Sequence, residues 1–462
     1  MTSFISPEVI RARFSAVMSD MYRDEVPLYG DLLTLVADVN KQALADSPAL
    51  KKQLIATGEL SRLNLERHGA IRLGKAEELA TMRRLFAVMG MHPVGYYDLA
   101  PAGVPVHSTA FRALSDSALN QSPFRVFTSL LRLDLITDKA LREQARNILD
   151  KRQIFTDGAL QLIEKYETDG GLTDAEADIF VREAVETFRW HDTATVSHEM
   201  YETLLNQHRL IADVVAFRGP HINHLTPRTL DIDAIQRGMA ERNITPKAVI
   251  EGPPRRNCPI FLRQTSFKAL NEAVTFTAED GTSQQGYHTA RFGEIEQRGV
   301  ALTDKGRQLY DQLLNETRAK VGGAPDESNA DEYMRVLAET FTAFPDDNLD
   351  LYRQGLAYFH HFVSDKVLPP RLENINESHL ADLIEQGHIT IEPMVYEDFL
   401  PVSAAGIFQS NLGDDEQKSY DGISNQALFE RDLGQKVHDL TAWYEEMQQH
   451  SIKACLRQLN RR

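Results

Sequence analysis

The sequence predicts an α+β protein in which two modules of βαβββ type form a cupped β-sheet and many helices surround that sheet. Two segments of the chain support this fold class, because each begins with a strand that carries an early histidine and continues with a helix and further strands. The identity between the two segments is low, so the internal repeat is weak. Paired modules of this kind collect side chains from both halves on the inner face of the sheet, where we expect a site.

The composition is that of an ordinary globular enzyme with an acidic charge balance. Among 462 residues, 42% are hydrophobic and 25% are charged, and the formal net charge is −17. This balance argues against a general nucleic-acid-binding protein and against adhesion to anionic lipid, because both need a basic face. Two cysteines, Cys258 and Cys455, imply no disulfide framework. With no signal-like N-terminus and no apolar run long enough for a bilayer, we expect a cytoplasmic location.

Residues 1–61 are predicted to form an N-terminal helical segment that packs against the rest of the protein and carries no catalytic residues. Ser6 stands where an N-cap belongs, Pro7 takes the first helical position and Glu8 lies in the first turn. A second helix is expected over residues 31–44.

Residues 62–300 are predicted to contain the cupped sheet and its metal site. In the first module, His68 and Arg72 are separated by an even number of residues, so a strand would point both side chains the same way. A helix is expected over residues 75–89, and strands follow it, one of them over residues 124–136.

A mainly helical insertion is predicted over residues 137–215. After it, the chain repeats the order of the first module, which is a strand, a helix and further strands. A strand carries His224, and Asp231 is placed to cap a helix over residues 232–242. Further strands are expected around residues 248–250, 260–264, 273–277 and 291–296.

Residues 301–462 are predicted to form a mainly helical C-terminal part. The stretch over residues 397–408 reads as a loop with small residues, which suits a lid or a pocket wall. The elements expected here are helices over residues 304–314, 331–344, 348–363 and 425–458, and a strand over residues 389–392.

Residues 291–299 alternate charged and apolar side chains, so they read as a strand with Glu294 and Glu296 on one face. Two histidines and one carboxylate, with the other positions open, are the facial arrangement that iron(II) oxygenases use. We therefore interpret His68, His224 and Glu294 as a metal site, with Glu296 as the rival carboxylate. Taken singly, each histidine is more often a core or surface residue, and Glu294 is more often solvated. The ordinary role of Glu296 would be to hydrogen-bond a ligand or to pair with Arg298.

Arg72 has two interpretations. It follows His68 by four residues, about 13 Å along an extended strand. The ordinary interpretation is a surface residue or one member of an ion pair. The functional interpretation is a clamp for a carboxylate distant from the metal, because the guanidinium fork pairs bidentately with carboxylates.

The remaining reactive residue types are interpreted as structural. His191 belongs to this group, as do His360 and His361, whose side chains would point apart on the helix expected there. Cys258 has no catalytic base near it in sequence and reads as a small buried residue. The sequence contains no phosphate-binding glycine loop, no Gly-x-Ser-x-Gly elbow and no Cys-x-x-Cys motif.

The stretches around His68, His224 and Glu294 resemble those of the 2-oxoadipate dioxygenase/decarboxylase family, which belongs to the vicinal-oxygen-chelate superfamily. The likeness runs nearly end to end. A more distant relative, 4-hydroxyphenylpyruvate dioxygenase, carries a Glu-x-x-Gln-Arg strand, which residues 294–298 match and which selects Glu294 over Glu296. The distinctive motifs are Ile222-Asn223-His224-Leu225-Thr226-Pro227-Arg228 and Leu262-Arg263-Gln264-Thr265-Ser266-Phe267-Lys268-Ala269-Leu270.

The resemblance implies an iron(II) enzyme that converts 2-oxoadipate and O2 to D-2-hydroxyglutarate and CO2 in lysine breakdown. Iron(II) would be held by His68, His224 and Glu294. Arg72 would bind the distal C6 carboxylate of the substrate, a 2-oxo dicarboxylic acid. The substrate-binding residues that the family implies are His68, Arg72, His224, Val402 and Ser403.

Two other functions remain open on the same scaffold. One is a glyoxalase-like isomerase or hydrolase that uses zinc, nickel or manganese, since two histidines and a glutamate also suit those metals. The other is a protein that binds a 2-oxo acid without turning it over. Oxygen consumption separates the dioxygenase from both.

Overall fold

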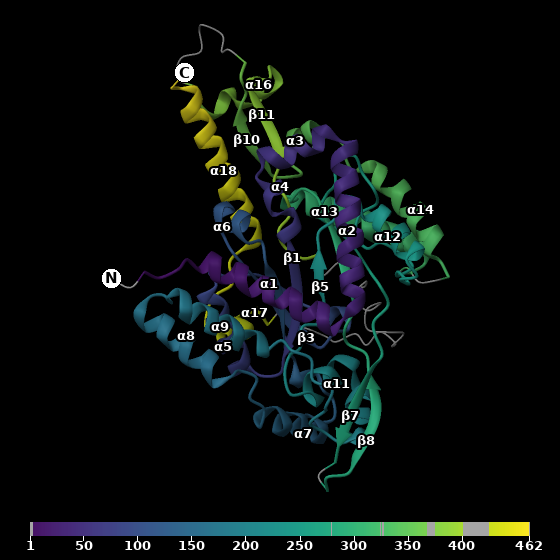
Figure 1. Ribbon diagram of the computed structural model, residues 1–462. Helices are drawn as coiled ribbons and strands as arrows, with labels where there is room; N and C mark the ends of the chain where they lie inside the picture. The colour runs from purple at the N-terminus through teal and green to yellow at the C-terminus, as the bar shows by residue number, and fades with distance from the viewer. Residues whose placement is uncertain are drawn as a thin grey trace.

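A five-stranded sheet of order β2-β3-β4-β1-β5 lies at the centre of the fold, with helices on both sides of it (Figure 1). The computed structural model describes residues 3–278, 280–323, 325, 328–366, 375–400 and 425–461. The mixed α+β class that the sequence predicts is confirmed.

The chain begins with helices and then enters the central sheet. The N-terminal elements are α1 (Pro7–Glu25), α2 (Pro27–Asp46), α3 (Pro48–Ala56), α4 (Glu59–Arg62) and the 3-10 turn η1 (Leu63–Leu65). The next elements are β1 (Arg67–Leu73), α5 (Ala76–Val88), β2 (His92–Asp98), η2 (Ala100–Ala102), β3 (Val106–Arg112), α6 (Asp116–Gln121), β4 (Arg125–Leu131) and η3 (Leu133–Leu135).

A helical insertion separates this segment from a second one that starts with a strand. The insertion contains α7 (Lys139–Asp150), α8 (Asp157–Asp169), α9 (Asp174–Glu186), α10 (His198–Gln207) and α11 (Arg209–Ala216). The second segment contains β5 (Leu225–Pro227), α12 (Ile232–Glu241), β6 (Leu262–Ser266), β7 (Glu272–Thr277), β8 (Ser283–His288) and β9 (Glu294–Arg298).

Among its described residues, the C-terminal part is helical apart from one pair of strands. Its elements are α13 (Asp304–Val321), α14 (Ala330–Thr340), η4 (Phe341–Ala343), α15 (Asn348–Arg353), β10 (Phe359–Val363), η5 (Glu377–His379), α16 (Leu380–Glu385), β11 (Ile389–Pro393), α17 (Gln426–Leu433) and α18 (Leu440–Leu459). In Figure 1, α18 runs beside β10 and β11.

Strand pairing brings the two segments together at β1. This strand pairs in parallel with β4 and antiparallel with β5, so His68 lies opposite Thr226. Strand β9 pairs antiparallel with β6, and a parallel bridge between Arg228 and Glu296 sets β9 beside the end of β5. The ends of β1, β5 and β9 therefore meet at one place.

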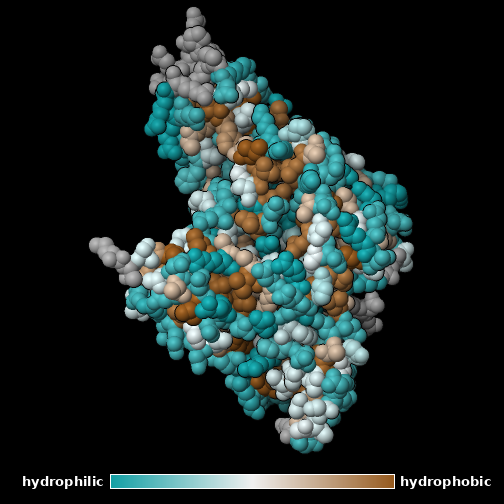
Figure 2. All heavy atoms as spheres, in the orientation of Figure 1, coloured by the Kyte–Doolittle hydropathy of each residue, from teal (hydrophilic) through white to brown (hydrophobic). Residues whose placement is uncertain are grey.

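Apolar side chains at helical spacing hold α5 against the sheet. Leu79, Met82 and Phe86 are fully buried on one face of this helix, as an amphipathic pattern requires. The Phe86 ring packs 4.8 Å from the ring of Phe111 in β3. The insertion helices α10 and α11 pack on other sheet residues, among them Phe127. On the face seen in Figure 2, hydrophilic side chains separate several apolar groups.

Several element predictions differ from the structure, and one of them is the strand predicted to carry His224, which begins one residue later. The helix predicted over residues 348–363 is wrong in its second half, because Gly355 adopts φ 62° and β10 follows with alternating burial. The single helix predicted over residues 425–458 is replaced by two helices, α17 and α18, because Gly434 at φ 74° ends α17. No strand forms at residues 248–250, and the next residue, Glu251, makes only an isolated bridge to Gln264. The strand predicted over residues 124–136 ends at Leu131.

Among the described residues, no helix combines the length and the apolar character needed to cross a membrane.

Candidate active site

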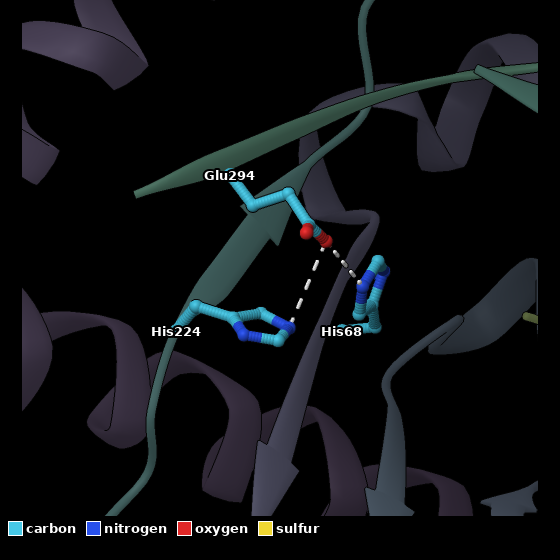
Figure 3. A group of neighbouring side chains, drawn as sticks. All are labelled: His68, His224 and Glu294. Carbon is cyan, nitrogen blue, oxygen red and sulfur yellow. Dashed lines mark hydrogen bonds and ion pairs between the residues drawn. The ribbon is translucent and has the colours of Figure 1, made fainter. Parts of the chain in front are cut away.

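Three side chains from separate strand ends converge on one buried point (Figure 3). His68 comes from β1, Glu294 from the start of β9, and His224 from the residue just before β5 rather than from the strand predicted to carry it. Nε2 of His68 lies 3.2 Å from Oε1 of Glu294, and Nε2 of His224 lies 3.7 Å from the same oxygen. One ligand atom from each residue falls within 4.8 Å of the other two, so the group could hold a metal ion.

Neighbouring polar side chains fix the Glu294 carboxylate. Oε1 of Glu294 accepts hydrogen bonds from Thr226 Oγ1 and from Gln264 Nε2, both at 3.0 Å. Thr226 lies opposite His68 in the β1–β5 pairing, and Ser266 lies opposite Glu294 in the β6–β9 pairing. The strand register therefore places the carboxylate between the two histidines.

The charges at this point suit a cation. Burial lowers the pKa of His224 to about 4, so its ring is neutral at pH 7 and can donate a nitrogen lone pair. Burial opposes the charge of Glu294, but the two histidines outweigh that effect and its pKa lies below the ordinary value. No Arg or Lys among the described residues lies within ion-pair distance of Glu294. A buried carboxylate that faces two imidazole rings and accepts from two neutral donors fits a bound metal ion.

Glu296, the rival carboxylate, has another role in this structure. Its Oε2 lies 3.0 Å from Nδ1 of His68, on the side of the ring away from Glu294, although the ring is not aligned for a standard hydrogen bond. Arg298 donates to both oxygens of Glu296, at 2.6 and 2.9 Å. Burial opposes the charge of Glu296, yet Arg298 and the nearby His68 hold its pKa well below the usual range. A carboxylate behind a ligating imidazole orients the ring and raises its basicity.

A small cavity of about 70 Å³ opens beside His224 and reaches Arg72. Its walls include Phe127, Leu210 and Phe292, so they are largely apolar. Arg72 forms an ion pair at 2.7 Å with Asp213, in agreement with the ordinary interpretation of this residue from the sequence. The Arg72 side chain also lines the cavity. Val402 and Ser403 lie outside the described residues.

The residues interpreted as structural are not members of the converging group. His360 and His361 belong to β10 rather than to a helix, and their side chains still alternate. Burial raises the pKa of the Cys258 thiol to about 11, so it carries no thiolate at pH 7. His191 does not belong to the group of possible metal ligands found among the described residues.

Comparison with known proteins identifies the family. A family profile described as 2-oxoadipate dioxygenase/decarboxylase matches residues 14–411. The chain belongs to this family. A 2-oxoadipate dioxygenase/decarboxylase of Pseudomonas putida is 61% identical over 457 residues, which cover 99% of this chain and 98% of that protein. A protein of the same name from Escherichia coli is 54% identical over 459 residues, covering 98% of this chain and 99% of that one.

A solved structure agrees with this assignment to the 2-oxoadipate dioxygenase/decarboxylase family. The crystal structure described as the hydroxyglutarate synthase in complex with 2-oxoadipate from Pseudomonas putida superposes with a TM-score of 0.91. Its sequence is 58% identical, and the match covers 100% of both chains. The resemblance stated from the sequence motifs is confirmed, and the chain is an enzyme.

Sequence reasoning missed several residues that this member of the family places around the site. Thr226 and Gln264 lie inside the two distinctive motifs, yet nothing in their residue types indicated contact with Glu294. Asp213 lies in the helical insertion, 141 residues after Arg72, and no sequence signal connected the two. Phe399, whose ring lies 4.8 Å from that of His68, belongs to the stretch interpreted as a pocket wall.

Proposed function

We propose that this chain is an iron(II)-dependent dioxygenase that converts 2-oxoadipate and O2 to D-2-hydroxyglutarate and CO2. The observation that carries the proposal is the buried convergence of His68, His224 and Glu294 beside a cavity that also contains Arg72. The names of the relatives support the substrate and the reaction class. A role in lysine breakdown and a cytoplasmic location are part of the same proposal.

The protein side chains would perform three tasks in this reaction. His68, His224 and Glu294 would hold iron(II) and leave the other coordination positions open. Arg72 would pair with the distal C6 carboxylate of the substrate. The apolar wall formed by Phe127 would exclude water from the reacting end. Val402 and Ser403 are proposed to add substrate contacts.

The net reaction balances without a separate reductant. The C1–C2 bond of 2-oxoadipate breaks and C1 leaves as CO2. One oxygen atom of O2 enters the new carboxylate at C2, and the other becomes the hydroxyl on the adjacent carbon. Iron(II) in this site would supply chelation of the 2-oxo acid and activation of O2. The four electrons that reduce O2 come from the substrate itself.

We also propose the finer architecture that the sequence suggested. The first βαβββ module would be β1-α5-β2-β3-β4. The second would contain β5, α12, β6 and β9, with the isolated bridge from Glu251 to Gln264 in place of its remaining strand and with β7 and β8 as an added hairpin. The parallel pairing of β1 with β4 and the parallel bridge from the end of β5 to β9 support this correspondence. The division into an N-terminal segment to residue 61, a core to residue 300 and a C-terminal part stays a proposal.

The test is oxygen uptake by protein that has been reconstituted anaerobically with iron(II). We expect uptake on addition of 2-oxoadipate, equimolar with CO2 and 2-hydroxyglutarate, and much less with 2-oxoglutarate or 4-hydroxyphenylpyruvate. His224→Ala should abolish uptake. Turnover without oxygen would favour an isomerase or hydrolase on this scaffold, and binding of 2-oxoadipate without any turnover would favour a non-catalytic binding protein.

A further inference from the structure

Arg72 forms an ion pair with Asp213, a buried carboxylate of the helical insertion. Nη1 of Arg72 donates to Oδ2 of Asp213 at 2.7 Å, and Asp213 is only 6% exposed. Among the described residues, Nη2 and Nε of Arg72 have no hydrogen-bond partner, and the Arg72 side chain lines the cavity. One edge of the guanidinium group is thus anchored while other donors stay available to a ligand.

Asp213 itself is fixed by two buried histidines. Its other oxygen, Oδ1, lies 2.9 Å from Nε2 of His288 and 3.3 Å from Nε2 of His221. The Tyr201 hydroxyl lies 2.8 Å from Nδ1 of His288, so this ring lies between the tyrosine hydroxyl and the Asp213 carboxylate and is within hydrogen-bond distance of both. Burial alone would raise the pKa of Asp213, but His221 and Arg72 outweigh it and hold that pKa well below its usual range.

This chain of contacts joins three parts of the fold to the cavity. Tyr201 comes from α10, Asp213 from α11 and His288 from the end of β8. Leu210 lies three residues before Asp213, on the same face of α11, and lines the cavity directly. One helix of the insertion therefore supplies both a wall of the cavity and the anchor of its arginine.

We propose that Asp213 is a positioning residue that fixes Arg72 at a set distance from the metal site and so selects 2-oxo acids with a distal carboxylate. The inference rests on the proposed function and assigns a task to the helical insertion. An anchored guanidinium group meets the carboxylate without first losing rotamer freedom, which favours binding. An arginine without its anchor would sample other rotamers, and the distal carboxylate would lose its partner.

A different role for Asp213 predicts the opposite result. If Asp213 mainly competed with the substrate for Arg72, removal of its charge would strengthen the binding of a dicarboxylic acid. Asp213→Asn separates the two roles, because it keeps the shape of the side chain and removes the charge. Tyr201→Phe is a milder variant that removes only the hydroxyl behind His288.

The experiment compares 2-oxoadipate with 2-oxohexanoate, which has the same chain length but no distal carboxylate. Iron-loaded wild type, Asp213→Asn and Tyr201→Phe are titrated anaerobically by calorimetry, and the Michaelis constant and kcat are then measured in air. For Asp213→Asn we expect both the dissociation constant and the Michaelis constant for 2-oxoadipate to rise about 10- to 100-fold. The constants for 2-oxohexanoate and the iron content should stay unchanged, and Tyr201→Phe should show a smaller shift in the same direction.

A matched control is available in α12. Asp233 forms a similar ion pair with Arg263, at 2.7 and 3.0 Å, but neither residue lines the cavity beside His224. Asp233→Asn should leave the ratio of the two substrates unchanged. Tighter or unchanged binding of 2-oxoadipate by Asp213→Asn would overturn the inference. Absence of oxygen uptake by the wild type would overturn the proposed function instead, while the anaerobic titration would still test Asp213.

Discussion

At the scale of single residues, His68 and Arg72 have different tasks, although both belong to strand β1. His68 points its Nε2 atom at Glu294, and Arg72 lines the cavity farther along the same strand and pairs with Asp213. Because neither Arg72 nor Asp213 belongs to the group that could hold a metal ion, binding of the metal and recognition of the distal carboxylate should be separable by mutation.

Replacing Arg72 and Glu294 in turn tests this separation. Arg72→Ala should retain iron and raise the Michaelis constant for 2-oxoadipate about 100-fold or more, because a charge-assisted pair with a carboxylate is lost. Glu294→Ala should lose iron after dialysis, because one of three protein ligands is gone. Metal analysis and oxygen uptake measure both variants. Loss of iron from Arg72→Ala would contradict the role given to Arg72.

The sequence predicted the residues of the site better than their surroundings. Two histidines and a glutamate were recognisable from residue type and motif, whereas alternation alone left Glu294 and Glu296 equivalent. The structure distinguishes them through Arg298 and Arg125, which lie within ion-pair distance of Glu296 and not of Glu294. Arg125 is 171 residues away in sequence, and a contact of that range has no local signal.

At the scale of elements, the prediction failed where the chain changes from helix to strand. Residues 348–363 contain both α15 and β10, separated by a turn at Gly355. His361 in β10 shows the packing that decides the strand: its Nδ1 lies 3.2 Å from Ser451 Oγ in α18, and its Nε2 lies 3.2 Å from the Tyr352 hydroxyl in α15. These tertiary contacts outweigh the local preference.

The buried ring of His361 predicts a loss of stability in mild acid. Burial lowers its pKa to about 4, against an ordinary value near 6.5. Between these values the unfolded chain binds a proton that the folded chain does not, so its contribution to stability is complete above pH 6.5 and falls as the pH decreases. From pH 7 to pH 5, the wild type should lose about 2 kcal/mol more than His361→Gln. Urea unfolding at both pH values measures this, and equal losses would contradict it.

At the scale of the whole molecule, a buried network of charges joins parts of the chain that are distant in sequence. Arg125 of β4 lies 2.7 Å from Glu66, 2.6 Å from Glu397 and 3.4 Å from Glu296, and Arg125 is itself fully buried. The network therefore joins the N-terminal part, both strand segments and the C-terminal part. Its members are Arg62, Arg125, Arg228 and Arg298 together with Glu59, Glu66, Glu296 and Glu397, so the charges of this set balance.

Arg125→Met tests whether this network holds the segments together. The substitution keeps much of the side-chain volume but leaves buried carboxylates without one of their cations, so we expect a loss of about 3–5 kcal/mol. Arg335→Met is the matched control, because the Arg335–Glu339 pair is exposed on both sides and such pairs contribute less than about 1 kcal/mol. Urea unfolding of the two variants measures the difference. Since Glu296 also lies against His68, Arg125→Met should in addition weaken iron binding, whereas Arg335→Met should not. Equal stability of the two variants would mean that the balanced charges contribute little to holding the parts of the fold together.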